Sequence, residues 1–359
     1  MNFTTEILTD VNENEWNKTL TKSKASTAFQ IASIYRPHQA AFGSKPFFIL
    51  IKKPTGEIVG QLSTVVHFKN YWLNSNVLSS SLTNKLNLGS TLSWINGPII
   101  HDSSNQDQIF SLVLTAVDRV AKENKVLMIK GSSPPLALQI PKELYVKNGY
   151  DYKRWVTYIT NLNQKQDELF HSLHNKTRYD VRKGEKNSLT FEVVNKRSVL
   201  EEYAEVKFQG VKRKNNIIKR NIILRDNLWE NLYKNGYEKL FVVRHKGILV
   251  GGIMNMIFNR NIVDSVTNSP RRDLFGGSFL TWNTIKWSVE NDYSTYDVGG
   301  ANPLPVSEKE KGIRFFKSKW GGKEIDYALF TKILDKTRLR IFRTIAQPNR
   351  IFNKIVNHL

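Results

Sequence analysis

Apolar positions at two different spacings divide the first half of the chain into strands and helices. Residues 47–52 and 58–68 have the apolar pattern of strands, and Pro54 and Gly56 between them supply the turn of a hairpin. Between residues 106 and 123, apolar side chains recur at the spacing of one helix face. The other elements predicted in this half are a helix over 13–22 and strands over 92–100, 126–129 and 155–162.

The second half repeats this order of elements. Its predicted helices cover 167–184, 199–212 and 278–291, and its predicted strands cover 189–194, 240–244, 249–259, 262–267, 295–298 and 324–334. Because each half shows a helix, a long hairpin and then a strand–helix–strand unit, we predict an α/β fold with mixed sheets of the α+β kind, built by tandem duplication. The expected domains are 1–162 and 163–334.

Residues 335–359 follow the second domain as a basic amphipathic helix. Such a helix can lie on anionic lipid or pack on its own domain. No basic-then-apolar leader and no run of about 18 apolar residues is visible. We therefore expect a cytoplasmic protein, with peripheral membrane contact if residues 335–359 face lipid.

Composition narrows the chemistry. Hydrophobic residues make up 40% of the chain, which is typical of a globular protein, and the absence of cysteine excludes disulfides, thiolate nucleophiles and thiolate metal sites. The net charge of +21 favours a polyanionic partner, namely nucleic acid, anionic lipid or a phosphorylated ligand. The alternative is that many of the lysines serve only solubility.

Basic residues are densest between residues 171 and 225, with 14 Lys or Arg against 6 Asp or Glu. Arg178 and Arg182 are four residues apart on a predicted helix, so their like charges share one face and repel. With Lys183 they form a candidate phosphate-binding face. A solvated charged face is the alternative.

A second candidate anion site lies between a predicted strand and a predicted helix. Arg272 precedes Gly276 and Gly277, and glycines at a helix N-terminus can present backbone N–H groups to a phosphate. Phe275 occupies the position where the pyrophosphate loop of acetyl-coenzyme A enzymes would have its first glycine. A plain turn is therefore an equal alternative.

Two glycine pairs near the C-terminus enclose a basic, aromatic segment. Lys317 can pack its stem on aromatic rings and direct its ammonium toward an oxyanion or phosphate, or it can be a surface lysine on a short helix. Asp297 can orient or deprotonate an attacking amine, or cap the loop that follows. Tyr296 and Trp320 are expected substrate contacts. The two segments are Tyr296-Asp297-Val298-Gly299-Gly300 and Gly312-Ile313-Arg314-Phe315-Phe316-Lys317-Ser318-Lys319-Trp320-Gly321-Gly322.

Together these segments resemble the closing motif of the Fem-type aminoacyltransferases, which carry two Gcn5-related N-acyltransferase domains in tandem. The resemblance covers roughly residues 25–334. Weaker landmarks that agree with it are Phe29-Gln30, Asn96-Gly97-Pro98-Ile99 and Thr177-Arg178-Tyr179-Asp180-Val181-Arg182-Lys183.

The resemblance implies acyl transfer to an amine. The donor is aminoacyl-tRNA in the best-known members and acyl-coenzyme A in relatives, and the acceptor is a lipid-linked or nucleotide-linked peptidoglycan precursor. The family pattern implies that Lys317 lies near the donor's RNA end or the reaction centre, and that Arg178, Arg182 and Lys183 contact acceptor phosphates. The chain departs from the pattern at 128–132, where the family's acidic residue is missing, and it lacks the inserted helical arm of some tRNA-using members.

Two function hypotheses follow. The first is a metal-independent transferase without a tightly bound cofactor, which uses acyl-coenzyme A or aminoacyl-tRNA as donor substrate. Its acceptor would be a small-molecule or lipid-linked amine that bears phosphate. The second is a catalytically silent basic protein of the same fold that binds RNA or an anionic membrane surface.

Overall fold

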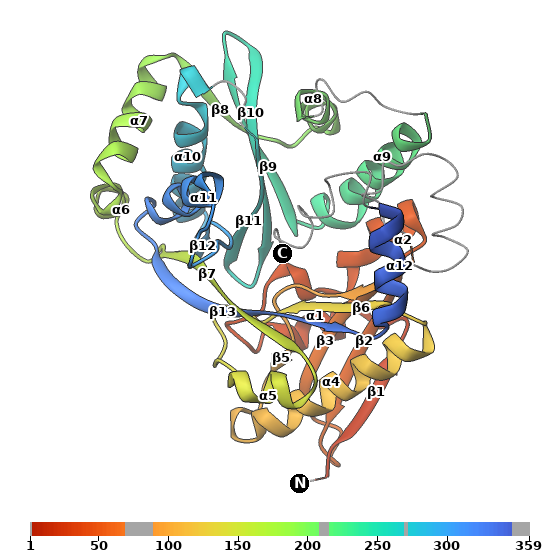
Figure 1. Ribbon diagram of the computed structural model, residues 1–359. Coiled ribbons are helices and arrows are strands. Elements are labelled where there is room, and N and C mark those ends of the chain that lie inside the picture. The colour runs from red at the N-terminus through yellow and green to blue at the C-terminus, as the bar shows by residue number, and fades with distance from the viewer. Residues whose placement is uncertain (1, 69–88, 208–214, 269–271, 347–359) are drawn as a thin grey trace. The chain divides into compact units, whose positions relative to one another are not determined.

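The computed structural model describes residues 2–68, 89–207, 215–268 and 272–346, which belong to two compact units (Figure 1). The first unit comprises residues up to Arg154 and again from Tyr327, and the second comprises Trp155–Asp326. The chain passes into the second unit within β7 (Asp151–Asn161) and returns within β13 (Lys323–Ile333).

The first unit is built on a mixed sheet with the strand order β1-β2-β3-β4-β6-β13, and β5 pairs with β3. Only the β4–β6 pair is parallel among the pairings in this described part. Helix α4 (Gln106–Glu123) packs on one face through the fully buried Ile109, Val113 and Val117. The strands are β1 (Thr4–Leu8), β2 (Lys45–Lys52), β3 (Ile58–His67), β4 (Thr91–Ser93), β5 (Ile99–Ile100) and β6 (Met128–Ser132).

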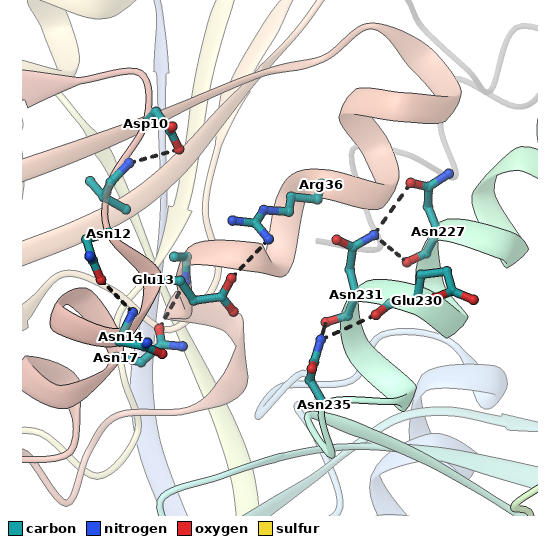
Figure 2. A network of polar contacts seen from close by, with 12 residues as sticks. Asp10, Asn12, Glu13, Asn14, Asn17, Arg36, Asn227, Glu230, Asn231 and Asn235 are labelled. Carbon is teal, nitrogen blue, oxygen red and sulfur yellow. Dashed lines mark hydrogen bonds and ion pairs between the residues drawn. The ribbon is translucent and has the colours of Figure 1, made fainter.

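Short helices complete this unit. Helix α1 (Glu13–Leu20) begins after Asn12, whose side-chain oxygen accepts the N–H groups of Asn14 and Glu15. Glu13 also pairs with Arg36 at 3.0 Å (Figure 2). The other helices are α2 (Arg36–Phe42) and α5 (Lys142–Lys147), with single turns at Ala28–Gln30, Ala32–Tyr35 and Ser103–Asn105.

The second unit has the strand order β7-β12-β11-β10-β9-β8, in which only the β11–β12 pair is parallel among the described pairings. Helices α10 and α7 cover one face of this sheet and α8 lies against the other (Figure 1). Strand β10 is buried along almost its whole length because both of its faces are covered. The strands are β8 (Leu189–Val193), β9 (Glu238–His245), β10 (Ile248–Phe258), β11 (Asn261–Asn268) and β12 (Thr295–Asp297).

The helices of the second unit carry most of the predicted site residues. They are α6 (Gln166–Ser172), α7 (Asn175–Lys186), α8 (Arg197–Lys207), α9 (Asn215–Leu228), α10 (Gly276–Glu290) and α11 (Glu308–Ser318). A wide turn, Trp229–Tyr233, extends α9, and the Asn231 side chain donates to the Asn227 carbonyl there (Figure 2).

The same succession occurs in both units. An antiparallel meander of three strands is followed by a helix and then by a strand parallel to the third: β2-β3-β4, α4 and β6 in one unit, and β9-β10-β11, α10 and β12 in the other. The expected α/β class with mixed sheets and two similar units in tandem is confirmed.

Several predicted boundaries differ from the structure. The helix predicted over 167–184 is two helices, because Leu173 is extended and the His174 side chain caps α7 by accepting the Lys176 N–H. The divisions expected after residues 162 and 334 are replaced by the division within β7 and β13. This happens because β7 pairs with β12 from Ile159 onward, while β13 pairs with β6 from Leu329 onward.

The first part of the C-terminal segment packs on its own unit. Helix α12 (Lys336–Ala346) buries Leu339 and Phe342 against Leu127, so this apolar face is covered by protein. Residues 347–359 of the predicted helix lie outside the described residues. In the part of the chain that the structure describes, no helix has the length and apolar character needed to cross a bilayer.

Candidate active site

Strands β11 and β12 part from each other beside the first glycine pair. Their parallel pairing ends at Val263 and Asp297, although β11 continues to Asn268. An extra residue in β11, Ser265, forms a bulge opposite β10, and bulges bend a strand away from its neighbours. The chain beyond β12 stays with β7 instead, through the Val298 N–H bond to the Tyr158 carbonyl. The place just beyond Val263 and Asp297, where β11 and β12 no longer pair, is the gap between these two strands.

Lys317 reaches this gap from α11. Its ammonium donates to the Gly300 carbonyl at 2.7 Å and lies 3.1 Å from where a side chain at Gly299 would begin. Gly299 also has a φ of +78°, so both its conformation and the space around it require glycine. The first glycine pair thus lets a lysine approach the backbone closely.

Asp297 stabilises the same turn through hydrogen bonds. The residue is 6% exposed, and its Oδ1 accepts the Gly299 N–H at 2.8 Å and the Thr157 hydroxyl from β7. This geometry is that of the loop cap considered as an alternative in the sequence. Asp297 therefore fixes the backbone that in turn receives Lys317.

Burial and charge act against each other on these groups. Burial lowers the pKa of Lys317, and the carboxylates of Asp264 and Asp297 oppose that shift. Burial raises the pKa of Asp297, while Thr157, the Gly299 N–H and Lys317 oppose it. The gap therefore holds a partly desolvated ammonium near two carboxylates, an arrangement that responds strongly to any new charge placed beside it.

A polar network borders a pocket next to α11. The Arg314 guanidinium donates to the Tyr158 hydroxyl at 3.1 Å and to the Pro303 carbonyl at 2.6 Å, and it pairs with Glu324 at 3.1 Å. The pocket has a volume of about 340 Å³ and is also lined by Lys311 and Phe315. The sequence did not predict this network. Its side chains come from β7, α11 and β13, which are far apart in the chain and meet only in the folded unit.

The three cations of the basic helix face make different contacts. Arg178 directs its guanidinium to the carbonyls of His171 and Leu173, at 2.6 and 2.7 Å, and to the Asn175 side chain, so it caps the end of α6. Arg182 lies over the Phe170 ring and Lys183 over the Tyr179 ring. Arg178 therefore makes three hydrogen bonds within the protein, whereas Arg182 and Lys183 lie against aromatic rings.

The glycine loop begins α10, and the two aromatic candidates lie in the core. Gly276 begins α10 and Gly277 follows it, with Phe275 in the left-handed conformation just before them. Arg272 lies in a single turn before this helix, and its side chain lies outside the described residues. Tyr296 and Trp320 are fully buried in the hydrophobic core of this unit, which differs from the expected substrate contact.

Two residues that complete the gap were not predicted. Thr157 lies on β7, and Asp264 lies within the apolar run of β11. An acidic residue inside an apolar strand was an available signal, because burial of a charge needs a reason. Thr157 left no such signal, since its role depends on the register of β7 with β12.

The chain resembles known proteins in structure rather than in sequence. No protein-family model and no curated protein sequence matches it. Among solved structures, FemX matches with a TM-score of 0.66 at 16% identity, over 95% of this chain and 100% of that one. A tandem GNAT protein from the clavulanic acid biosynthesis pathway matches with 0.53 at 9% identity, over 94% and 100%.

A third solved structure has a similar fold. L-PGS from Bacillus licheniformis matches with a TM-score of 0.51 at 16% identity, over 95% of this chain and 98% of that one. At identities this low, the structural matches establish the fold only, and the activity has to be argued from the site. The architecture described above is therefore a fold shared with FemX and with a tandem GNAT protein, as the closing motif of the sequence indicated.

Proposed function

We propose that this protein transfers an acyl or aminoacyl group from an activated ester or thioester to an amine. The observation that carries the proposal is the Lys317 ammonium, held at the gap between β11 and β12 by the Gly300 carbonyl. A positioned cation in a partly desolvated site stabilises the negative charge that develops on an acyl oxygen during such a transfer.

The chemical steps assign a role to each group. The acceptor nitrogen attacks the acyl carbon, and the carbonyl oxygen becomes an oxyanion that the Lys317 ammonium stabilises. The intermediate then collapses with cleavage of the C–O bond of an ester or the C–S bond of a thioester. The leaving oxygen or sulfur takes up the proton that the amine releases. Because such donors are already activated, positioning supplies much of the rate enhancement.

Asp297 acts in this proposal as a positioning residue. By accepting the Gly299 N–H it keeps the Gly299–Gly300 turn in the conformation that presents the Gly300 carbonyl to Lys317. It thereby orients the acceptor amine through the shape of the gap.

The donor and acceptor classes rest on the fold and the charge. FemX and L-PGS share this fold, and the net charge of +21 suits a polyanionic substrate, so we propose aminoacyl-tRNA or acyl-coenzyme A as donor. Donor phosphates are assigned to the N–H groups of Gly276 and Gly277, together with Arg272. The acceptor is a small or lipid-linked amine whose phosphate lies near Arg182 and Lys183.

A donor-consumption assay tests the proposal. The purified protein is incubated with labelled acetyl-coenzyme A or labelled aminoacyl-tRNA and a panel of amines that includes aminophospholipid vesicles. We expect one donor class to be consumed only when an amine is present. Consumption of neither donor, combined with tight and salt-dependent RNA binding, would instead support the catalytically silent RNA-binding alternative.

A further inference from the structure

A row of three polar side chains crosses the sheet of the first unit. Lys130 in β6 is the register partner of Ser93 in β4 on one side and of Thr331 in β13 on the other. Side chains paired across neighbouring strands point to the same face of a sheet. The Lys130 side chain therefore leaves the sheet between two residues that carry hydroxyl groups.

The row lies on the face opposite the α4 core. Ile129 is fully buried in that core, and a side chain added at Gly131 would meet the Trp94 ring at 2.5 Å and the Phe330 ring at 2.8 Å. Because alternate residues of a strand point to opposite faces, Lys130 points away from this core. Ser93, Lys130 and Thr331 are each half-buried.

None of these three side chains hydrogen-bonds or ion-pairs with any residue in the described ranges. The lysine that follows Thr331 in β13 does have such partners. Lys332, which points to the opposite face, donates to Asp118 at 2.6 Å and to the Asn148 carbonyl at 3.0 Å. A half-buried ammonium without a counter-charge is costly, and burial lowers the pKa of Lys130.

An oxyanion would satisfy all three groups at once. The ammonium has three N–H donors and each hydroxyl has one O–H donor, so the row offers donors and a positive charge together. We propose that Ser93, Lys130 and Thr331 form a binding site for an oxyanion, either a phosphate or a carboxylate group. The site lies in the first unit and is separate from the Lys317 gap in the second unit.

Amine labelling with an N-hydroxysuccinimide ester of acetate tests this site without any transfer reaction. The rate of Lys130 acetylation is measured by peptide mass spectrometry at pH 8, with 20 mM phosphate, 20 mM acetate or sodium chloride at matched ionic strength. We expect phosphate or acetate to slow labelling of Lys130 at least 5-fold. The exposed Lys147 on α5 serves as the control and should label at an unchanged rate.

The two anions distinguish the ligand. Protection by phosphate alone assigns a phosphate group, and equal protection by acetate assigns a carboxylate. The double variant S93A/T331V, checked for folding by circular dichroism, should lose most of the protection. Labelling of Lys130 that no anion slows more than that of Lys147 would overturn the site, and so would full protection in the folded double variant.

Discussion

At the scale of single residues, the candidate site depends on a chain of contacts. Thr157 and the Gly299 N–H fix Asp297, and the turn that Asp297 holds receives the Lys317 ammonium. Lys317 could be identified from its place in the closing motif. Thr157 could not, because it enters the site through the register of β7 with β12, which leaves no local pattern. Asp264 left one signal, an acidic residue within an apolar strand, but nothing in the sequence linked it to Lys317.

The role of Asp297 can be separated from that of a general base. Asp297→Asn keeps an oxygen that accepts the Gly299 N–H, so we expect it to retain most of the turnover of the wild-type protein. Asp297→Ala removes the acceptor and leaves the half-buried Gly299 N–H without its partner, so kcat should fall more than 10-fold. The comparison is made by steady-state kinetics, with KM determined separately. Equal losses in the two variants would identify Asp297 as the base.

Two half-buried histidines of the first unit lead us to expect a loss of stability in acid. Burial lowers the pKa of His67 and of His101 to about 4, against 6.5 for the free side chain. Between pH 6.5 and 4 the unfolded chain therefore binds protons that the folded chain does not, and stability falls as the pH falls through this window. We expect each histidine to account for about 2 kcal/mol of that loss.

Urea unfolding measured at pH 7 and at pH 4.5 checks this expectation. His67→Asn and His101→Asn should each reduce the difference in unfolding free energy between the two pH values. An unchanged pH dependence in both variants would show that other groups control acid stability.

At the scale of elements, the packing of α7 on α10 positions the basic helix face. Gly184 in α7 lies so close to α10 that an added Cβ would be 2.7 Å from the Phe279 Cβ. Gly312 in α11 has open space around the same position. The two glycines therefore form a matched pair, one required by packing and one free to change.

Alanine at these two positions should have opposite effects. Gly184→Ala should destabilise the protein by about 1–3 kcal/mol through overpacking. Gly312→Ala should stabilise it by about 0.5–1 kcal/mol, because alanine favours the helix over glycine. Denaturant unfolding with a common slope for both variants gives the two values. A Gly184→Ala protein as stable as the wild type would contradict the close approach of these helices.

Sequence patterns located long, regular elements better than short ones. Residues 106–123 have a strong helical period and form α4 with those bounds, whereas α2 and β1 were missed because each is only a few residues long. The single helix expected over 167–184 divides at Leu173, where an uninterrupted apolar period hides the capping role of His174. Local patterns do not reveal a break that a side-chain cap produces.

At the scale of the whole molecule, the tandem α/β organisation follows from the repeated order of elements. The division between the units does not follow from that order, because β7 and β13 each contribute residues to both units. The apolar pattern of each strand does not change at the residue where the chain passes from one unit to the other. The Lys317 gap lies in the second unit and the row around Lys130 lies in the first. Each can therefore be tested by substitutions confined to one unit.

Turnover of the Lys317→Ala variant tests the proposed function most directly. The donor that the wild-type protein consumes is used with its amine, and the control is Lys309→Ala, an exposed lysine on the same helix. We predict that Lys317→Ala lowers kcat about 10²–10³-fold, because a charge-stabilising donor is lost, and that Lys309→Ala leaves it unchanged. Wild-type turnover in a folded Lys317→Ala protein would contradict the assignment of the reaction to this gap.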